Sequence, residues 1–217
     1  MEVDRVFGAG PAAQLAAAAA GGDGARVREL AARGADLNAR GRDDVTLLQW
    51  ALLHRSADGL RALLAAGADA SRPGIDGASV LHLAAAAEDP AYLKLLLAQG
   101  ADPDVPHART GATPLMAALM AGRSAQVRLL LESKAQLAAA DAQGDTALHV
   151  AAKVNDAASA LLLLQAGADP GARNQRGVTF QRYLALTPER VLSAEAQVQR
   201  RALRAWLAGH GIATEFS

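Results

Sequence analysis

The stretch that decides the fold is TALHVAAKVNDAASALLLLQAGAD, residues 146–169. It opens with a threonine that can cap a helix, and it closes on a glycine that suits a left-handed helix end. The opening motif recurs along the chain, as TLLQWA from Thr46, SVLHLA from Ser79, TPLMAA from Thr113 and TFQRYL from Thr179.

The closing GAD motif recurs in phase with the opening motif. Its successive starts lie 33, 33, 34 and 33 residues apart, and those of the opening motif lie 33, 34, 33 and 33 apart. Two landmarks in one register indicate an internal repeat. GAD begins at Gly34, Gly67, Gly100 and Gly167, and a degenerate KAQ at Lys134 takes the remaining slot.

Each repeat predicts a first helix, a turn, a second helix and an extended hairpin. The hydroxyl of the opening threonine or serine can accept a hydrogen bond at the helix start, and Pro114 fits a first helical turn. In the second helix, Leu93, Leu96 and Leu97 have the i, i+3, i+4 spacing of an apolar stripe. One repeat alone would leave this stripe exposed, so neighbouring repeats must stack.

This pattern resembles the ankyrin repeat family, in which T-P-L-H-x-A opens the first helix and G-A-D closes the second. The resemblance covers about residues 13–211. It implies an all-α fold with short β-hairpin loops, an ankyrin repeat α-solenoid of about six stacked units of about 33 residues. We expect a single domain over 1–217, with an N-terminal capping repeat at 13–41, four internal repeats at 42–174 and a divergent C-terminal capping repeat at 175–217.

The last repeat departs from the pattern. It keeps Thr179 as a helix start but has Arg182 where other repeats carry the motif histidine. Thr187-Pro188-Glu189 predicts a new helix start, and a further helix is expected over 193–208. Terminal repeats often become polar outside, so a solvated face is expected for Arg190, Arg200, Arg201 and Arg204.

A glycine-rich turn near the start could suggest a dinucleotide site. Gly8, Gly10 and Ala13 fit G-x-G-x-x-A, and Glu29 stands where an acidic residue could hold a ribose. Such a site needs a buried strand before the turn and further β-α units, and the sequence predicts neither. Ala13 also lies one repeat length before Thr46. These glycines are therefore the entrance turn of the first repeat, and we expect no cofactor.

Composition limits the classes of partner. The chain has 22 basic and 22 acidic residues, so its charge predicts attraction to neither nucleic acid nor membrane. It has no cysteine, which excludes disulfides and thiolate metal sites. The longest charge-free run, 6–22, is too short to span a bilayer. A signal peptide would need a more basic start. The sequence leaves two compartments open, the bacterial cytoplasm or, if a signal peptide has been removed, the periplasm.

No pattern for catalysis or metal binding emerges. The resemblance implies that His82 and His149, inside the motif, tie adjacent repeats together. His54, His107 and His210 lack the spacing of metal ligands, so we expect no metal. Asp102 and Asp104 form a close acidic pair only within a hairpin start. We therefore expect no enzyme activity and no catalytic residues.

In the ankyrin family, hairpin tips and the ends of first helices line a concave face that contacts partners. Trp50 is expected to pack inward and would be a binding anchor if partly exposed. The alternative is that solvated loops simply vary in sequence. By register, the predicted partner-binding residues are Arg40, Arg42, Asp43, Trp50, His54, Ile75, Asp76, His107, Arg109, Met120, Asp145, Lys153, Arg173 and Arg176.

The sequence favours a non-catalytic scaffold that binds a partner protein on this face and is a monomer when unbound. Short bacterial ankyrin proteins resemble, in some families, immunity proteins that block a toxic secreted enzyme such as a lipase. One alternative is an accessory protein that protects a stress enzyme, and another is a purely structural role. A third is a site for an anion or small molecule in the last repeat, where the candidate residues are Arg173, Arg176, Arg182 and Arg190.

Overall fold

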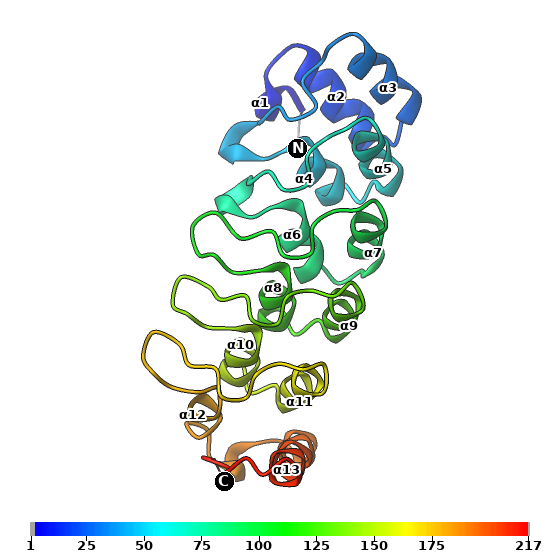
Figure 1. Ribbon diagram of the computed structural model, residues 1–217. Helices are drawn as coiled ribbons and strands as arrows, with labels where there is room; N and C mark the ends of the chain where they lie inside the picture. Colours follow the sequence, from blue (N-terminus) through cyan, green and yellow to red (C-terminus); the bar gives the residue numbers. More distant parts are fainter. Residues whose placement is uncertain (1–2, 217) are drawn as a thin grey trace. The chain divides into compact units, whose positions relative to one another are not determined.

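The computed structural model describes residues 3–216, which form two compact units, 3–109 and 110–216. The first unit contains α1 (Val3–Phe7), α2 (Pro11–Ala20), α3 (Gly24–Ala32), α4 (Leu47–Leu53), α5 (Ala57–Ala65), α6 (Val80–Ala86) and α7 (Ala91–Ala98), with short 3₁₀ turns η1 (Arg42–Asp44) and η2 (Ile75–Gly77) (Figure 1). The second contains α8 (Pro114–Met120), α9 (Ser124–Glu132), α10 (Ala147–Lys153), α11 (Ala157–Gln165), α12 (Gln181–Leu184), η3 (Glu189–Val191) and α13 (Ala194–Gly209).

Each unit has two layers of helices. In residues 3–109, α2, α4 and α6 form the layer next to the hairpin loops, and α3, α5 and α7 form the other (Figure 1). In residues 110–216 the hairpin-side helices are α8, α10 and α12. Most of the leucines predicted to line the second helices are fully buried, although Leu97 is only half-buried, and this pattern confirms the helix-pair repeat. The fully buried leucines include Leu63, Leu96, Leu130 and Leu163.

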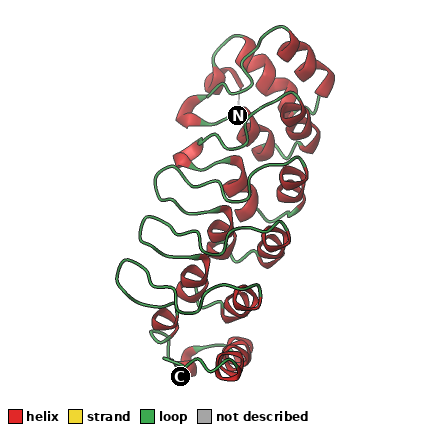
Figure 2. Ribbon diagram, viewed as in Figure 1, coloured by secondary structure: helices red, strands yellow, loops and turns green. Residues whose placement is uncertain are grey.

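The hairpins are loops held by few backbone hydrogen bonds. Figure 2 shows no strand among residues 3–216, where pairing is limited to isolated bridges such as that between Arg40 and Thr46. Successive hairpins within a unit are nevertheless joined, by N–H···O bonds from Ala108 to Gly77 (2.9 Å), from Ala142 to Thr110 (2.8 Å) and from Gln175 to Gln143 (3.0 Å).

Hydroxyl side chains begin the first helices of internal repeats, as predicted. Thr46 Oγ1 accepts a hydrogen bond from the N–H of Gln49 at 3.2 Å. Thr113 Oγ1 accepts one from the N–H of Met116 at 3.4 Å. Each bond satisfies one of the amide groups that a helix start leaves without a partner.

Left-handed residues end the second helices at the predicted positions. Gly34 and Gly167 have φ angles of 84° and 100°. Lys134, in the degenerate slot, adopts φ of 61° despite its side chain. That conformation costs an L-residue about 1–2 kcal/mol, so the slot retains its geometry where it has lost its glycine.

Motif side chains of α4 and α10 tie these first helices to the next hairpin. Gln49 Nε2 donates to the carbonyl of Ala78 at 2.8 Å, and its Oε1 accepts from the N–H of Ile75 at 3.1 Å. His149 Nε2 donates to the carbonyl of Val178 at 3.1 Å. The Gln49 amide and the His149 imidazole thus both bind the backbone of the next hairpin. This is the role that the resemblance implies for His149.

The last repeat is shifted by one residue from its predicted register. Gln181 is buried; its Nε2 donates to the carbonyl of Ala213 at 3.1 Å, and its Oε1 accepts from the N–H of Glu215 at 2.9 Å. Arg182, predicted for this slot, is exposed. The predicted cap at Thr179 is also wrong, because its hydroxyl bonds to the Glu215 carboxylate at 3.4 Å. The tail takes the place of a following hairpin, and Gln181 turns toward it.

The predicted final helix is present as α13, but the prediction that Arg200 lies on its solvated face is wrong. Arg200 is 1% exposed rather than solvated. Its guanidinium donates to the carbonyl of Thr187 at 2.6 Å, to that of Leu184 at 3.0 Å and to Asn155 Oδ1 at 3.2 Å. The guanidinium can be buried because two backbone carbonyls at and after the end of α12, and one side chain after α10, accept its hydrogen bonds. Arg204 instead pairs with Glu189 at 2.8 Å.

Candidate protein-binding surface

Charged residues on the hairpin tips of the first unit pair with one another. Arg109 Nη2 donates to Asp76 Oδ1 at 3.0 Å, and Arg40 Nη1 lies 3.6 Å from Asp44 Oδ1. All four side chains are exposed, so each pair contributes no more than about 1 kcal/mol. A partner could therefore replace these contacts at little cost.

A cavity of about 390 Å³ lies between α1, the two hairpins and the end of α4. We call it the Trp50 cavity. Four predicted partner-binding residues line it together: Arg42, Asp43, Trp50 and Ile75. The remaining wall residues are Arg5, Val6, Val45 and Leu53.

Trp50 packs inward, as its place in the motif predicts. It is 1% exposed, since the ring of Phe7 meets it edge-on at 5.4 Å and that of His54 lies 4.1 Å away. His54 itself is exposed, and its Nδ1 lies 2.9 Å from the carbonyl of Trp50. Trp50 therefore does not offer an exposed anchor, and only the cavity wall gives access to it.

Apolar side chains are exposed at matching ends of the hairpin-side helices. Leu53 at the end of α4 is 51% exposed, and Met120 at the end of α8 is 68% exposed. Val154, which follows α10, is 43% exposed, and the Lys153 side chain beside it is 38% exposed. The residues just before them are buried, among them Leu52, Leu119 and Ala152. Exposure thus begins where each helix ends.

Asp145 is buried, so its prediction as an outward-pointing tip residue is wrong. It is 1% exposed and forms an ion pair with Lys153, while Asn174 Nδ2 donates to its Oδ1 at 2.7 Å. Burial acts to raise the pKa of Asp145, but hydrogen bonds from Lys153 and Asn174 outweigh it, so the pKa is lowered. Tyr183 completes this cluster, because its hydroxyl accepts from Asn174 at 2.8 Å and Lys153 lies over its ring.

Among residues 3–216, the arginines proposed as an anion site share no hydrogen-bond partner. Arg173 donates to the carbonyl of Gly177 in its own hairpin at 2.6 Å. Arg176, Arg182 and Arg190 are exposed. Arg173 and Arg176, which are also predicted partner-binding residues, lie in the same hairpin.

His107 is partly buried, and its ring meets that of His82 edge-on at 5.6 Å. Residues 3–216 contain no group of three or more His, Asp or Glu side chains that could hold a metal ion. Nor does any helix in this range have the length and apolar character to cross a membrane.

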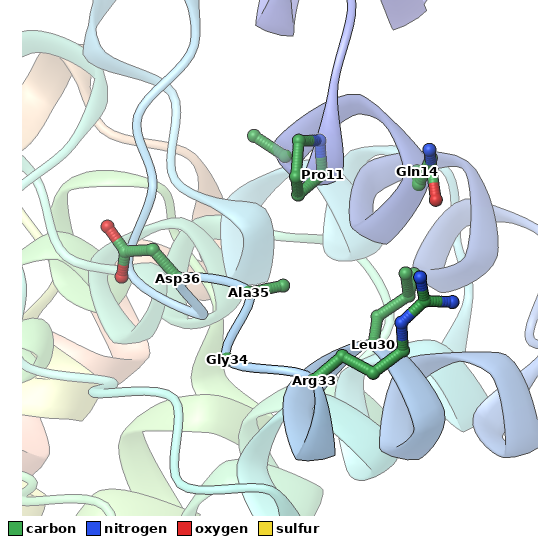
Figure 3. Close-up of a pocket in the computed structure, with 8 residues that line it drawn as sticks. Pro11, Gln14, Leu30, Arg33, Gly34, Ala35 and Asp36 are labelled. Carbon is green, nitrogen blue, oxygen red and sulfur yellow. The ribbon is translucent and has the colours of Figure 1, made fainter.

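A second hollow lies on the N-terminal repeat, between α2, α3 and the loop after α3 (Figure 3). Pro11 and Gln14 line it from α2, while Arg33 and Asp36 lie at separate places around it. Arg33 also pairs with Glu29 at 3.3 Å. Because none of the predicted partner-binding residues lines this hollow, it is not part of the candidate surface.

Helix α1, which forms one wall of the Trp50 cavity, was not predicted from the sequence. Val3, Val6 and Phe7 have the i, i+3, i+4 spacing that indicates a helix, so a signal was present. Gly8 and Gly10 then form the predicted turn, with φ of 70° and 144°. A helix of five residues is too short to be stable alone, so its stability comes from packing on α2, on the first hairpin and on Trp50.

Comparison with known proteins agrees with these repeats. Residues 81–174 match the family described as ankyrin repeats (3 copies). The crystal structure of the ankyrin repeat domain of Bcl-3, described as a unique member of the IkappaB protein family, matches with a TM-score of 0.72 and 30% identity over 86% of this chain and 81% of that one. The chain belongs to the ankyrin repeat family.

A curated relative of this ankyrin repeat protein is Protein PhlB of Serratia liquefaciens. The two are 46% identical over 140 residues, which make up 64% of this chain and 62% of the relative. The match thus spans less than two thirds of that protein. Ankyrin repeats generally serve as scaffolds for protein–protein interaction, so the family indicates a protein partner for this chain.

Proposed function

We propose that this chain is a non-catalytic scaffold that binds another protein through its hairpin tips and the ends of its hairpin-side helices. The observation that carries the proposal is the exposure of Leu53 and Met120 at the ends of their helices, directly after buried residues, together with the exposure of Val154 just after α10. Apolar side chains of this size favour burial against a partner, and their positions are held by a packed framework. Little ordering entropy is then lost on binding.

Charges on the tips would supply specificity. Arg40, Arg42 and Arg109 stand beside Asp43 and Asp76, and all five are exposed. A mixed set of exposed charges steers association and rejects partners with the wrong pattern, while contributing less to affinity. Within residues 3–109, the apolar end of α4 and the charged tips are both exposed, as a surface for one particular partner requires.

The partner that we propose is a toxic secreted enzyme, such as a lipase, that this chain inhibits as a bacterial immunity-type protein. Similarity to a Serratia protein supports a bacterial source. A rigid preformed surface supports tight one-to-one inhibition. The unbound chain is then a monomer. Protection of a stress enzyme would use the same surface, and the partner's identity separates the two roles.

An anion or small-molecule site in the last repeat is less well supported. Arg200 and Arg204 are engaged within the cap, and Arg173 is held by its own hairpin. The protein-binding role therefore accounts for more of the exposed residues than an arginine site does.

The proposal is tested by affinity capture from a lysate of the source organism, read by mass spectrometry. Wild type is compared with a charge reversal, Arg40→Glu, Arg42→Glu and Arg109→Glu. A matched control reverses Arg28, Arg61 and Arg128, which are exposed on the second-layer helices α3, α5 and α9. We expect one protein that wild type and control retain and the tip reversal loses. A partner retained equally by all three would contradict the proposed surface.

A further inference from the structure

A cluster of interacting side chains joins α10, α12 and the hairpin that precedes α12. Asp145 is buried and forms an ion pair with Lys153. Asn174 Nδ2 donates to Asp145 Oδ1 at 2.7 Å and to the Tyr183 hydroxyl at 2.8 Å. The Lys153 ammonium also lies 5.0 Å from the centre of the Tyr183 ring. We call these four residues the Tyr183 cluster. It holds Lys153 in place although that side chain is 38% exposed.

Two further cations lie beside the Tyr183 cluster. The backbone N–H of Arg176 donates to Asn174 Oδ1 at 3.0 Å, and Arg182 directly precedes Tyr183 in α12 (Figure 1). Both arginine side chains are exposed, and neither has a hydrogen bond or an ion pair among residues 3–216.

The carboxylates of the adjoining hairpin and of the C-terminal tail are engaged elsewhere. Asp141 accepts two backbone N–H groups of its own hairpin, at 2.8 and 2.9 Å. Glu215 in the tail accepts a hydrogen bond from the Thr179 hydroxyl at 3.4 Å. Asp145 is paired with Lys153. Because the described part of the chain supplies neither arginine with a counter-ion, this surface is complementary to carboxylates of a partner.

Exposed apolar side chains adjoin the cations. Val154 follows Lys153 directly and is 43% exposed, and Leu186, just after α12, is 65% exposed. Leu186 follows the motif residue Gln181 by five positions. Val154 follows its own motif residue, His149, by the same number, so the two occupy equivalent places in neighbouring repeats. A free anion would leave this apolar surface in water, whereas a protein segment can bury it.

We propose that the surface made up of Lys153, Val154, Arg176, Arg182 and Leu186 binds an acidic segment of the partner protein. Carboxylates of the segment pair with the guanidinium groups of Arg176 and Arg182, and one of its apolar side chains covers Val154 and Leu186. Lys153 borders the segment as a cation that is already held in place, so little ordering entropy is lost there. This inference rests on the proposed function, and it names the chemistry of the partner segment.

The test uses a random peptide display library. The library is first depleted on the double reversal, Arg176→Glu with Arg182→Glu, and is then selected on the wild-type full chain. We expect surviving peptides that are richer in Asp and Glu than the starting library and that carry an apolar residue. No surviving peptide, or survivors without acidic enrichment, would overturn the proposal.

Variants of the chain then locate the site of the peptides. A control, Arg128→Glu with Arg201→Glu, reverses two exposed arginines of α9 and α13 and should bind the peptides as wild type does. Arg182→Glu should weaken acidic peptides about tenfold or more, and a peptide in which lysine replaces an acid should restore binding. Loss of binding on the control, or no rescue at any acidic position, would contradict the proposed pairs.

A fold check keeps the charge changes interpretable. Circular dichroism should give the same helix content for every variant. Where a reversal unfolds the chain, Arg176→Gln with Arg182→Gln removes both charges without adding acids, and it should still weaken acidic peptides. Unchanged affinity of this folded variant would overturn the proposal.

Two readouts separate a protein segment from a free anion. Leu186→Ser removes apolar surface and should weaken the peptides, because the segment covers this side chain. Inorganic phosphate should not displace the peptides when ionic strength is held constant. Displacement by phosphate, or unchanged binding to Leu186→Ser, would assign the arginines to a small anion and overturn the proposal.

Failure of this inference is distinguishable from failure of the proposed function. If the captured partner loses binding on the triple reversal of Arg40, Arg42 and Arg109 but keeps it on the double reversal of Arg176 and Arg182, the scaffold role stands and this inference is wrong. If the partner is retained by both reversals, the proposed function itself is wrong.

Discussion

The side chain of Gln49 occupies the space beside Gly74: a Cβ added to Gly74 would lie 1.9 Å from Gln49 Oε1. The same amide bonds to Ile75 and Ala78, on either side of the turn. This close approach of the Gln49 side chain is by itself sufficient reason for glycine at position 74.

Gly74→Ala should therefore lower the free energy of unfolding by about 1–3 kcal/mol, the usual cost of overpacking. Urea denaturation monitored by circular dichroism measures the change. Gly209→Ala is the control, because a Cβ there meets nothing within 4 Å. Equal stability of the two variants would show that Gln49 does not hold the hairpin as described.

Lys134→Gly should stabilise the chain by about 0.5–1 kcal/mol. Glycine adopts the left-handed conformation without the steric cost that lysine bears, and the greater entropy of glycine in the unfolded chain offsets part of this gain. The melting temperature would rise. Lys134→Ala keeps the steric cost and removes the charge, so it should give no such gain. A similar rise in both variants would assign the effect to charge instead.

Asp145 should make stability depend on acid pH. Its pKa is lowered in the folded chain, so the stabilisation is present above the unfolded pKa of about 3.9 and is lost as pH falls through the lower folded value. Asp145→Asn should cost about 1–3 kcal/mol at pH 7, because it removes the ion pair with Lys153. Urea midpoints of the two proteins, measured from pH 7 downward, should converge below about pH 4. Parallel curves would contradict the lowered pKa.

Leu96→Ala and Leu130→Ala should each lower the free energy of unfolding by about 2–5 kcal/mol, because both side chains are fully buried and leave cavities. The triple reversal of Arg40, Arg42 and Arg109 should shift the melting temperature by only a few degrees, since exposed pairs contribute little. Scanning calorimetry of the three proteins checks this. Comparable losses from core and tip changes would contradict the layered architecture.

Periodicity was sufficient to predict the helix pairs, because each repeat must bury the same stripe against its neighbours. The starts at Thr46 and Thr113 and the left-handed ends at Gly34 and Lys134 follow from backbone chemistry that acts within a few residues. Local chemistry of this kind can be read from a single sequence.

The predictions that failed concern residues whose hydrogen-bond partners come from segments distant in the sequence. Gln181 rather than Arg182 takes the motif slot because the tail offers it a hairpin-like pair of backbone groups. Arg200 and Asp145 are buried because acceptors and donors from other elements surround them. For the Trp50 cavity, α1 showed an apolar spacing, but no local pattern indicates where so short a helix packs.

The hydrogen bonds between successive hairpins have a mechanical consequence. In residues 110–216, the hairpins are joined by the backbone bonds from Ala142 to Thr110 and from Gln175 to Gln143, which span nearly one repeat along the chain. A pulling force applied at one end would break such links one after another rather than all at once, because each repeat contacts only its neighbours. Every detached repeat would free about 33 residues, which extend to about 110 Å. Under tension this protein should therefore lengthen in steps, each of which corresponds to the unfolding of one repeat.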